Sequence, residues 1–260
     1  REPLLLGLNG CQGSGKSTLA AFMVMALQAR HGLRAVTVSL DDFYLTQAER
    51  RLLAQDVHPL LRTRGVPGTH DLALMASTLA ALTEPASAEG RTVLVPSFDK
   101  ARDERTNKEH WRRVTGLIDV VIWEGWCLGV QPQPEQQLFT PVNTLEQVED
   151  DDGCWRRYVN TQLNGYQALF DQVDYWLMLK SPTFGCVYDW RLEQEKKLAQ
   201  RCPDAASVMS EEDIARFIAH YQRLTEWGFA SLPPRMDTLF ELDVHRAIER
   251  VLQPRKEANA

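Results

Sequence analysis

Cysteine is scarce in this sequence, and no two cysteines stand at the spacing of a metal or redox motif. The 260 residues contain an odd number of cysteines, five, and no CxxC pair. Neither a disulfide framework nor a zinc site is indicated, and the pattern suits a reducing compartment, for which we expect the cytoplasm. The five cysteines are Cys11, Cys127, Cys154, Cys186 and Cys202.

Long hydrophobic runs and an excess of positive charge are also missing. No stretch approaches the roughly 20 apolar residues of a membrane span, and the first residues lack the basic and then apolar pattern of a signal segment. The net charge of −6 is the opposite of what a nucleic-acid backbone attracts. The sequence therefore predicts no membrane and no nucleic acid among the partners. Separately, we expect a small-molecule partner and a monomer or homodimer.

The strongest pattern present is a complete phosphate-binding loop. An apolar run, LLLGLN at residues 4–9, leads directly into GCQGSGKS at residues 10–17, and an apolar helical pattern follows from Thr18 to about Gly32. Backbone N–H groups of such a loop and the helix dipole behind it bind nucleotide phosphates. We predict that ATP is bound by Gly10, Cys11, Gln12, Gly13, Ser14, Gly15, Lys16, Ser17 and Thr18.

Two residues of this loop and one distant carboxylate predict a magnesium site. Lys16 should reach the β- and γ-phosphates, and the hydroxyl of Ser17 should bind Mg²⁺. Glu124 ends the apolar run at residues 117–123, at the edge of the sheet where the phosphate loop is expected. Because Mg²⁺ takes oxygen ligands and retains water, Glu124 is suited to hold it through water.

Further apolar runs alternate with helical segments. Strands are expected at residues 34–40, 92–95, 117–123, 175–179 and 238–242, and helices from Ser181 towards Arg201 and from Ser210 to about Gly228. Continuous apolar strands of this kind are typical of a parallel sheet covered on both faces. We therefore predict an α/β protein of the P-loop NTPase class, with a doubly wound, mostly parallel sheet and a helical lid at about 181–202, forming one domain over residues 1–260.

Asp41 is the candidate general base. It directly follows the second predicted strand, so it should share an edge of the sheet with the phosphate loop, where ligands bind. Its carboxylate could accept the proton of an acceptor hydroxyl during phosphoryl transfer. The alternative is that Asp41 and Asp42 only cap the following helix.

Four other polar segments allow two readings each. The loop at residues 62–71 and the segments 97–100 and 102–105 could bind a small polar acceptor or be solvated loops. Arg191 could close over the triphosphate as a lid cation, or belong to a charged helix face with a Glu193–Lys197 pair. The acidic run at residues 149–153 is expected to be a solvated turn.

Several of these segments together resemble the D-glycerate 3-kinase family of plants, fungi and bacteria. That family belongs with the phosphoribulokinases, uridine kinases and pantothenate kinases. The resemblance rests on the phosphate loop and on SLDDFY at 39–44, RGVPGTHD at 64–71, PSFDK at 96–100, EGW at 124–126 and RLEQE at 191–195. One departure is ARDER at 101–105, where the family often has a glycine-rich run ending in Gly-Asp-Arg, so the acceptor-side loop should differ in shape.

The resemblance implies site residues as well as an activity. Asp41 matches the catalytic base, and the acceptor-binding segments fall at about 58–71 and 96–113. The residues implied for the acceptor are Asp42, Tyr44, Arg64, His70, Asp71, Asp99, Lys100 and Arg105.

The reaction that these patterns predict is phosphorylation, dependent on ATP and Mg²⁺, of the primary hydroxyl of a small hydroxy acid, with D-glycerate giving 3-phosphoglycerate as the leading case. Pantothenate, a nucleoside or a sugar phosphate are alternative acceptors. A nucleotide-switched binding protein is a different class, but residues 107–110 read NKEH and lack the aspartate of the NKxD motif that binds guanine. Cys11 in the phosphate loop is expected to be an inert packing residue; the alternative is that its place near a helix N-terminus lowers the thiol pKa and makes it oxidisable.

Overall fold

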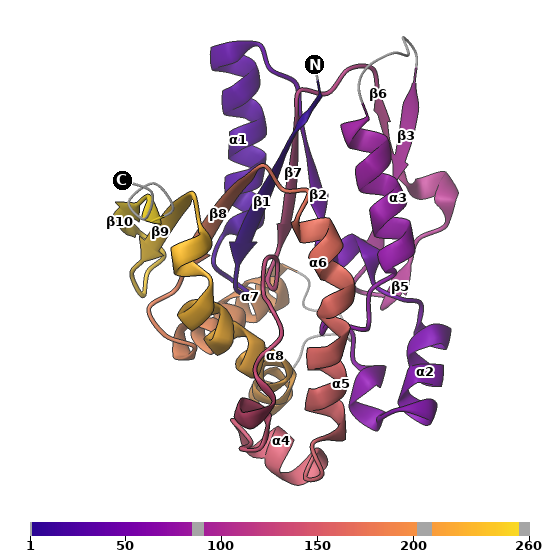
Figure 1. Cartoon of the computed structure of the whole chain (residues 1–260), viewed down its shortest axis with the longest axis vertical. Coiled ribbons are helices and arrows are strands. Elements are labelled where there is room, and N and C mark those ends of the chain that lie inside the picture. Colours follow the sequence, from indigo (N-terminus) through magenta and orange to yellow (C-terminus); the bar gives the residue numbers. More distant parts are fainter. Residues whose placement is uncertain (1, 85–90, 202–209, 255–260) are drawn as a thin grey trace.

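A six-stranded sheet forms the centre of the computed structural model, which describes residues 2–84, 91–201 and 210–254 (Figure 1). The strand order is β10-β9-β8-β1-β7-β2. All neighbouring pairs are parallel except β10 and β9, which are antiparallel. The strands are β1 (Leu4–Gly10), β2 (Ala35–Ser39), β7 (Val120–Gly125), β8 (Tyr175–Lys180), β9 (Thr238–Leu242) and β10 (Ile248–Leu252). This confirms the predicted α/β class with a mostly parallel sheet.

Helices cover both faces of this sheet because its strands are apolar on both. Along β1, Leu5 joins one buried cluster, whereas Leu6 and Leu8 join the other. The Leu5 cluster includes side chains of α3 (Leu72–Thr83) and α6 (Asn164–Phe170), and the Leu6 cluster those of α1 (Lys16–His31) and α7 (Gly185–Arg201). Helix α8 (Glu211–Ser231) contributes to both clusters. Strand β1 therefore lies in the middle of the core, and its phosphate loop emerges at the carboxyl edge.

The strand predicted at residues 92–95 is confirmed, but it does not belong to the central sheet. This segment is β3 (Thr92–Val95), which pairs antiparallel with β6 (Arg112–Thr115) in a separate two-stranded sheet. Only Val95 of β3 is fully buried. The apolar residues of this segment therefore do not mean that both faces of the strand are covered. A second small hairpin pairs β4 (Phe98–Asp99) with β5 (Glu104–Arg105). Strand β10 is missing from the predictions because its residues are mostly exposed.

The remaining helices are α2 (Gln47–Asp56), α4 (Thr144–Glu149) and α5 (Cys154–Gln162). Helix α8 begins after Ser210, whose side chain forms a capping box with Asp213, as its sequence predicts. Helix α7 begins at Gly185 and not at Ser181. The Ser181 hydroxyl is buried, where it donates to the Thr183 carbonyl 3.2 Å away and accepts from the Cys11 thiol at 3.6 Å. Its place in the core excludes it as a helix cap. The predicted lid end at Cys202 lies outside the described residues.

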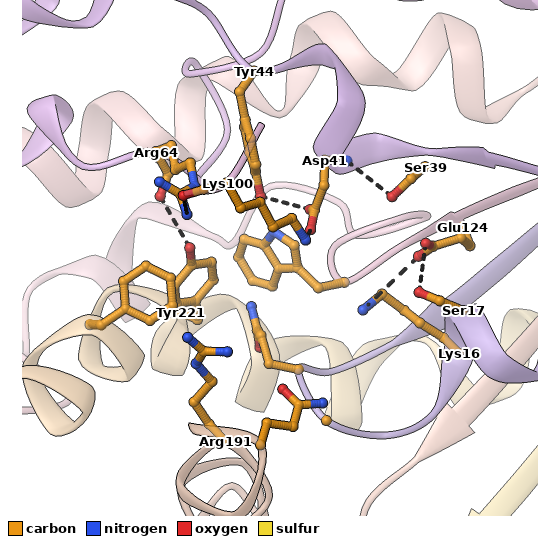
Figure 2. Close-up of a pocket in the computed structure, with 15 residues that line it drawn as sticks. Lys16, Ser17, Ser39, Asp41, Tyr44, Arg64, Lys100, Glu124, Arg191 and Tyr221 are labelled. Carbon is orange, nitrogen blue, oxygen red and sulfur yellow. Dashed lines mark hydrogen bonds and ion pairs between the residues drawn. The ribbon is translucent and has the colours of Figure 1, made fainter. Parts of the chain in front are cut away.

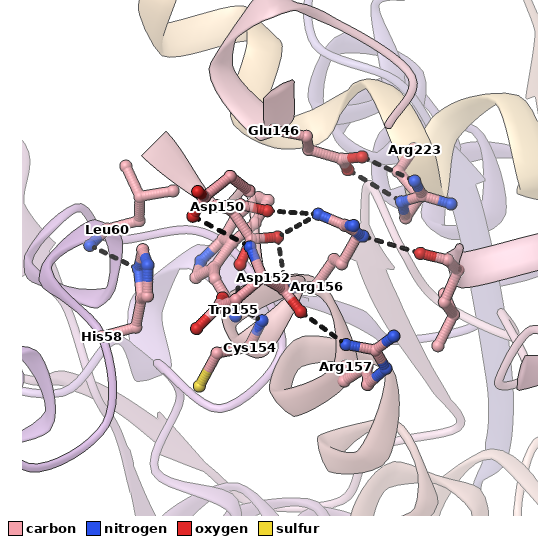
Figure 3. A network of polar contacts seen from close by, with 12 residues as sticks. His58, Leu60, Glu146, Asp150, Asp152, Cys154, Trp155, Arg156, Arg157 and Arg223 are labelled. Carbon is pink, nitrogen blue, oxygen red and sulfur yellow. Dashed lines mark hydrogen bonds and ion pairs between the residues drawn. The ribbon is translucent and has the colours of Figure 1, made fainter. Parts of the chain in front are cut away.

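The acidic run at residues 149–153 includes the expected solvated turn, in which Asp151 and Asp152 are exposed, but Asp150 is buried. Asp150 is 1% exposed and forms an ion pair of 2.9 Å with Arg156, while its carboxylate also accepts from the Trp155 and Arg156 backbone N–H groups (Figure 3). A second buried ion pair, Glu146 with Arg223, joins α4 to α8. Charges bury only when they are paired and hydrogen-bonded. The first ion pair thus joins the end of α4 to α5, and the second holds α8 against α4.

Candidate active site

The phosphate loop is open where a nucleotide phosphate would bind. Gly13 and Gly15 have φ angles of 77° and 89°, which favour glycine, and bring the chain from β1 into α1. A Cβ on Gly13 would lie 2.6 Å from the Trp190 Cβ, so α7 packs directly on the loop. Among the described atoms, none lies within 4 Å of a Cβ built on Gly15, and no side chain caps α1 there. The first N–H groups of α1 and its dipole therefore remain available to an anion.

Ser17 and Glu124 form a site that fits Mg²⁺. The Ser17 hydroxyl donates to Glu124 Oε1 over 2.9 Å. Glu124 Oε2 is buried without a hydrogen-bond partner among the described residues, and lies 4.0 Å from Lys16 Nζ (Figure 2). A buried carboxylate oxygen needs a cation or a donor. The hydroxyl and carboxylate oxygens next to the phosphate loop are the ligand type that Mg²⁺ prefers.

Asp41 follows β2 and lies in a short 3₁₀ helix, Leu40–Phe43, at the same edge of the sheet. Its Oδ1 accepts from the Tyr44 hydroxyl at 2.7 Å and its Oδ2 from Lys100 Nζ at 2.6 Å. Burial acts to raise the pKa of this carboxyl, but the charges of Lys100 and Lys16 outweigh it and hold the pKa well below its usual range. Asp41 is therefore ionised and able to accept a hydrogen bond from an acceptor hydroxyl.

These groups face one cavity of about 230 Å³, which we call the central pocket. Figure 2 shows Arg191 of α7 reaching into it from the side opposite Asp41. Arg64 is oriented by an ion pair with Asp103 and stacks over the Phe98 ring, with 5.5 Å from Cζ to the ring centroid. The central pocket is lined by Gln12, Gly13, Lys16, Ser17, Ser39, Asp41, Tyr44, Arg64, Lys100, Glu124, Trp126, Arg191, Gln194, Phe217 and Tyr221.

One wall of the central pocket requires glycine at position 65. Gly65 has a φ of 128°, and a Cβ there would lie 2.0 Å from the Tyr221 hydroxyl oxygen. That hydroxyl donates to the Arg64 carbonyl over 3.1 Å, and Trp126 Nε1 donates to the Gly65 carbonyl over 3.0 Å. The chain next to Arg64 is thus fixed by two aromatic side chains, one directly after β7 and one from α8.

Comparison with known proteins finds relatives in sequence and in fold. No protein-family model matches the chain. It is 35% identical over 228 residues to an uncharacterized kinase of Schizosaccharomyces pombe, covering 85% of this chain and 79% of that one. The solved structure of D-glycerate 3-kinase from Cryptococcus neoformans superposes with a TM-score of 0.81 at 29% identity, covering 97% of this chain and 90% of that one. The chain belongs to the D-glycerate 3-kinase family of P-loop kinases.

Another family member is longer than this chain. Over 227 residues the chain is 34% identical to the chloroplastic D-glycerate 3-kinase of Arabidopsis thaliana; the match covers 84% of the chain and 46% of the plant protein. As a member of the family, the chain is an ATP-dependent phosphotransferase with a hydroxyl acceptor on a small molecule. Over residues 2–84, 91–201 and 210–254, no helix is both long and apolar enough to cross a bilayer.

The family resemblance named eight acceptor residues, and the structure brings Tyr44, Arg64 and Lys100 into the central pocket. The other five, all among the described residues, do not line this pocket. They are Asp42, His70, Asp71, Asp99 and Arg105.

Each of these five supports a neighbouring loop. Asp42 Oδ1 accepts from the Phe98 N–H at 3.2 Å, and burial raises the pKa of this carboxyl to about 6. His70 stacks on Tyr44 and bonds to the Tyr166 hydroxyl through Nδ1, at 2.7 Å. Asp71 caps α3 and pairs with Arg105 at 2.9 Å, and Asp99 accepts from the Ala101 and Arg102 N–H groups.

Five residues of the central pocket were not predicted as site residues, namely Ser39, Trp126, Gln194, Phe217 and Tyr221. Trp126 could have been found, since it follows Glu124 at the end of the same apolar run. Phe217 and Tyr221 lie on α8, far along the sequence, and no local pattern separates them from other core residues of that helix. Burial raises the pKa of the Tyr221 hydroxyl well above its usual range, so it acts as a donor.

Two further expectations concern the phosphate loop and the lid. Burial raises the pKa of the Cys11 thiol to about 11, so the suggested lowered pKa is wrong. Arg191 forms an ion pair of 2.7 Å with Glu195. Glu193 pairs with Arg246, and the Lys197 side chain of the alternative pair lies outside the described part of the chain.

Proposed function

We propose that this chain transfers the γ-phosphoryl group of ATP to the primary hydroxyl of D-glycerate, giving 3-phosphoglycerate. The observation that carries the proposal is the place of Asp41, an ionised carboxylate in one cavity with the phosphate loop and the cations Arg64 and Lys100. A small hydroxy acid matches these groups, because its hydroxyl needs a base and its carboxylate needs a cation. The names of two family members, from Arabidopsis and Cryptococcus, support this acceptor.

Each part of the pocket then has a role in the transfer. The phosphate loop and Lys16 hold the triphosphate, and Asp41 accepts the proton of the acceptor hydroxyl. Ser17 and Glu124 would hold Mg²⁺, which would supply charge neutralisation at the phosphates. Arg191 stabilises charge on the group in transfer. Asp42, His70, Asp71, Asp99 and Arg105 serve the acceptor by holding the loops that carry Tyr44, Arg64 and Lys100.

Compartment and assembly are part of the proposal. Cys11, Cys127, Cys154 and Cys186 are free thiols, which suits a reducing compartment such as the cytoplasm. One chain supplies base, cations and phosphate loop to the same cavity. A monomer is therefore sufficient for the reaction, and a homodimer is compatible with it.

The acceptor is tested by ADP release with Mg-ATP against D-glycerate, L-glycerate, pantothenate, uridine and ribulose 5-phosphate. We expect strong stimulation by D-glycerate alone, with 3-phosphoglycerate identified by phosphorus NMR. Lys16→Met, which removes the phosphate-binding ammonium, controls for contaminating kinases. Stimulation by a different compound would replace the acceptor, and a flat panel over a slow basal rate would favour a nucleotide switch.

A further inference from the structure

In the central pocket, the proposed base is engaged at both oxygens. The Tyr44 hydroxyl lies 2.7 Å from Asp41 Oδ1 and the Lys100 ammonium 2.6 Å from Oδ2 (Figure 2). A carboxylate in direct contact with an ammonium is stabilised as the anion, so it accepts a proton poorly. The contact that keeps Asp41 ionised therefore also opposes its action as a base.

We propose that the carboxylate of the acceptor releases this base, by taking the Lys100 ammonium from Asp41 when it binds. This inference rests on the proposed function and adds a condition to it. The anionic group of the acceptor is needed for fast phosphoryl transfer once the acceptor is bound, in addition to its part in binding. Lys100 then has two roles. It controls whether the base is available, a role that we call the gate, and it binds the substrate carboxylate.

The structure allows this exchange at little cost. The Lys100 side chain is 61% exposed, against 22% for Asp41. An ammonium this exposed can be reached by a second carboxylate while it is still in contact with Asp41. Lys100 keeps a carboxylate as its partner, and Asp41 keeps the Tyr44 hydroxyl at Oδ1.

The backbone beside Lys100 stays fixed while its ammonium moves. Asp42 holds the Phe98 N–H over 3.2 Å, and Arg64 Nη2 donates to the Lys100 carbonyl over 3.4 Å. The flexible stem of lysine can then swing from Asp41 to a substrate carboxylate without rearranging the loop. Lys16, the other cation that lowers the pKa of Asp41, belongs to the phosphate loop and is committed to the nucleotide.

The transfer that follows balances without another reactant. The acceptor hydroxyl gives its proton to Asp41 Oδ2, and its oxygen forms a bond to the γ-phosphorus of ATP. The bond from that phosphorus to the oxygen of ADP breaks, and the proton leaves Asp41 for water afterwards. A water molecule in the pocket has no carboxylate, so it finds the base engaged and ATP hydrolysis stays slow.

The first test compares D-glycerate with D-glyceramide, which has the same hydroxyls but a neutral amide. For the unmodified protein we expect kcat at saturation to be at least about 10²-fold lower with the amide, the size of a lost general base. In Lys100→Met, whose base is never engaged by an ammonium, the two kcat values should agree within about tenfold, while KM for D-glycerate rises. Arg102→Met is the matched control, since Arg102 is on the same loop, 85% exposed and paired only with Asp99 in what the structure describes.

A second test needs no variant of the site. Ethylene glycol and formate are the two halves of the acceptor, one with the hydroxyl and one with the carboxylate. Formate should raise kcat with ethylene glycol by about tenfold or more in the unmodified protein, as expected when a separate carboxylate occupies the position beside Lys100.

The outcomes separate the two proposals. Full turnover of D-glycerate, with equal kcat for the amide and no effect of formate, would overturn the gate and leave the proposed function intact. No turnover of D-glycerate would overturn both. A gap in KM alone between the two acceptors would make Lys100 a binding cation only, which also overturns the gate.

Discussion

At the scale of the residue, Asp41 depends on its neighbours for its chemistry. The nearby Lys100 and Lys16 charges keep it ionised although it is buried. Asp41→Asn preserves the shape and removes the proton acceptor, so kcat should fall about 10²- to 10⁴-fold. KM for ATP should stay nearly unchanged, because the phosphate loop is untouched.

Steady-state kinetics with the proposed acceptor, D-glycerate, measure this effect. Asp171→Asn, at an exposed position outside the central pocket, is the control. Near-normal turnover of Asp41→Asn would show that another group takes the proton.

Glu124 should determine how much Mg²⁺ the protein needs for activity. Its Oε2 is buried without a hydrogen-bond partner among the described residues, which suits a hydrated cation. Glu124→Gln replaces this charge by an amide, so the Mg²⁺ concentration for half-maximal activity should rise by about tenfold or more. A titration with MgCl₂ at fixed ATP measures it, and an unchanged midpoint would remove Glu124 from the metal site.

At the scale of the element, the corner of α4, α5 and α8 tests how much a buried ion pair contributes. Arg223 binds Glu146 through Nε at 2.7 Å, with side-chain exposures of 6% and 1%. Arg223→Met should lower the free energy of unfolding by about 3–5 kcal/mol, because it leaves a buried carboxylate unpaired. The double variant with Glu146→Leu should lose less.

Urea denaturation measures these differences, and the same two helices supply the control. Arg216 of α8 pairs with Glu149 of α4 at 2.5 Å, but their side chains are 49% and 40% exposed. Arg216→Met should change stability by about 1 kcal/mol or less. Equal losses for the two arginine variants would contradict the role assigned to burial.

The contrast between elements also explains which features could be predicted from the sequence. The phosphate loop and Glu124 are encoded locally, by a strand followed by a loop or a turn. The burial of Asp150 depends on its ion pair with Arg156, which an acidic run does not reveal. The strand at residues 92–95 was assigned to the wrong sheet, because the sequence TVLV is equally compatible with a central strand and with a small hairpin. The proposed roles of individual site residues stay predictions until variants are measured.

At the scale of the whole molecule, the sheet order places β1 between β7 and β8. Phosphate loop and Glu124 thereby meet at one edge, although they are far apart in sequence. Tyr221 reaches the same pocket only because α8 packs on both buried clusters. Tertiary packing of this kind has no local signature. The division into one domain over residues 1–260 stays a prediction.

Buried titratable groups predict how stability of the whole fold changes with pH. Burial lowers the pKa of His70 and His220 from 6.5 to about 4, so the unfolded chain binds their protons first and stability falls as pH drops from 6.5 to 4. Burial raises the pKa of Asp42 from 3.8 to about 6, with the opposite sign. Between pH 4 and 6 the unfolded chain binds two more protons than the folded chain at the histidines and one fewer at Asp42. In total it therefore binds one proton more.

The free energy of unfolding should therefore rise by about 1.4 kcal/mol per pH unit over that range. His220→Leu removes one of the protons and should leave it nearly independent of pH there. Urea denaturation at several pH values between 4 and 6 measures both slopes. The same slope in the variant and in the unmodified protein would exclude His220 as a contributor.

The tryptophans at the site give the molecule an optical signal of its own. Trp126 forms part of the wall of the central pocket, and Trp190 packs against Gly13 of the phosphate loop. Indole fluorescence responds to nearby charge and polarity, so one ring is placed to report the acceptor and the other the nucleotide. Order of substrate binding can therefore be followed in unlabelled protein, with Trp126→Phe and Trp190→Phe assigning each signal to its ring.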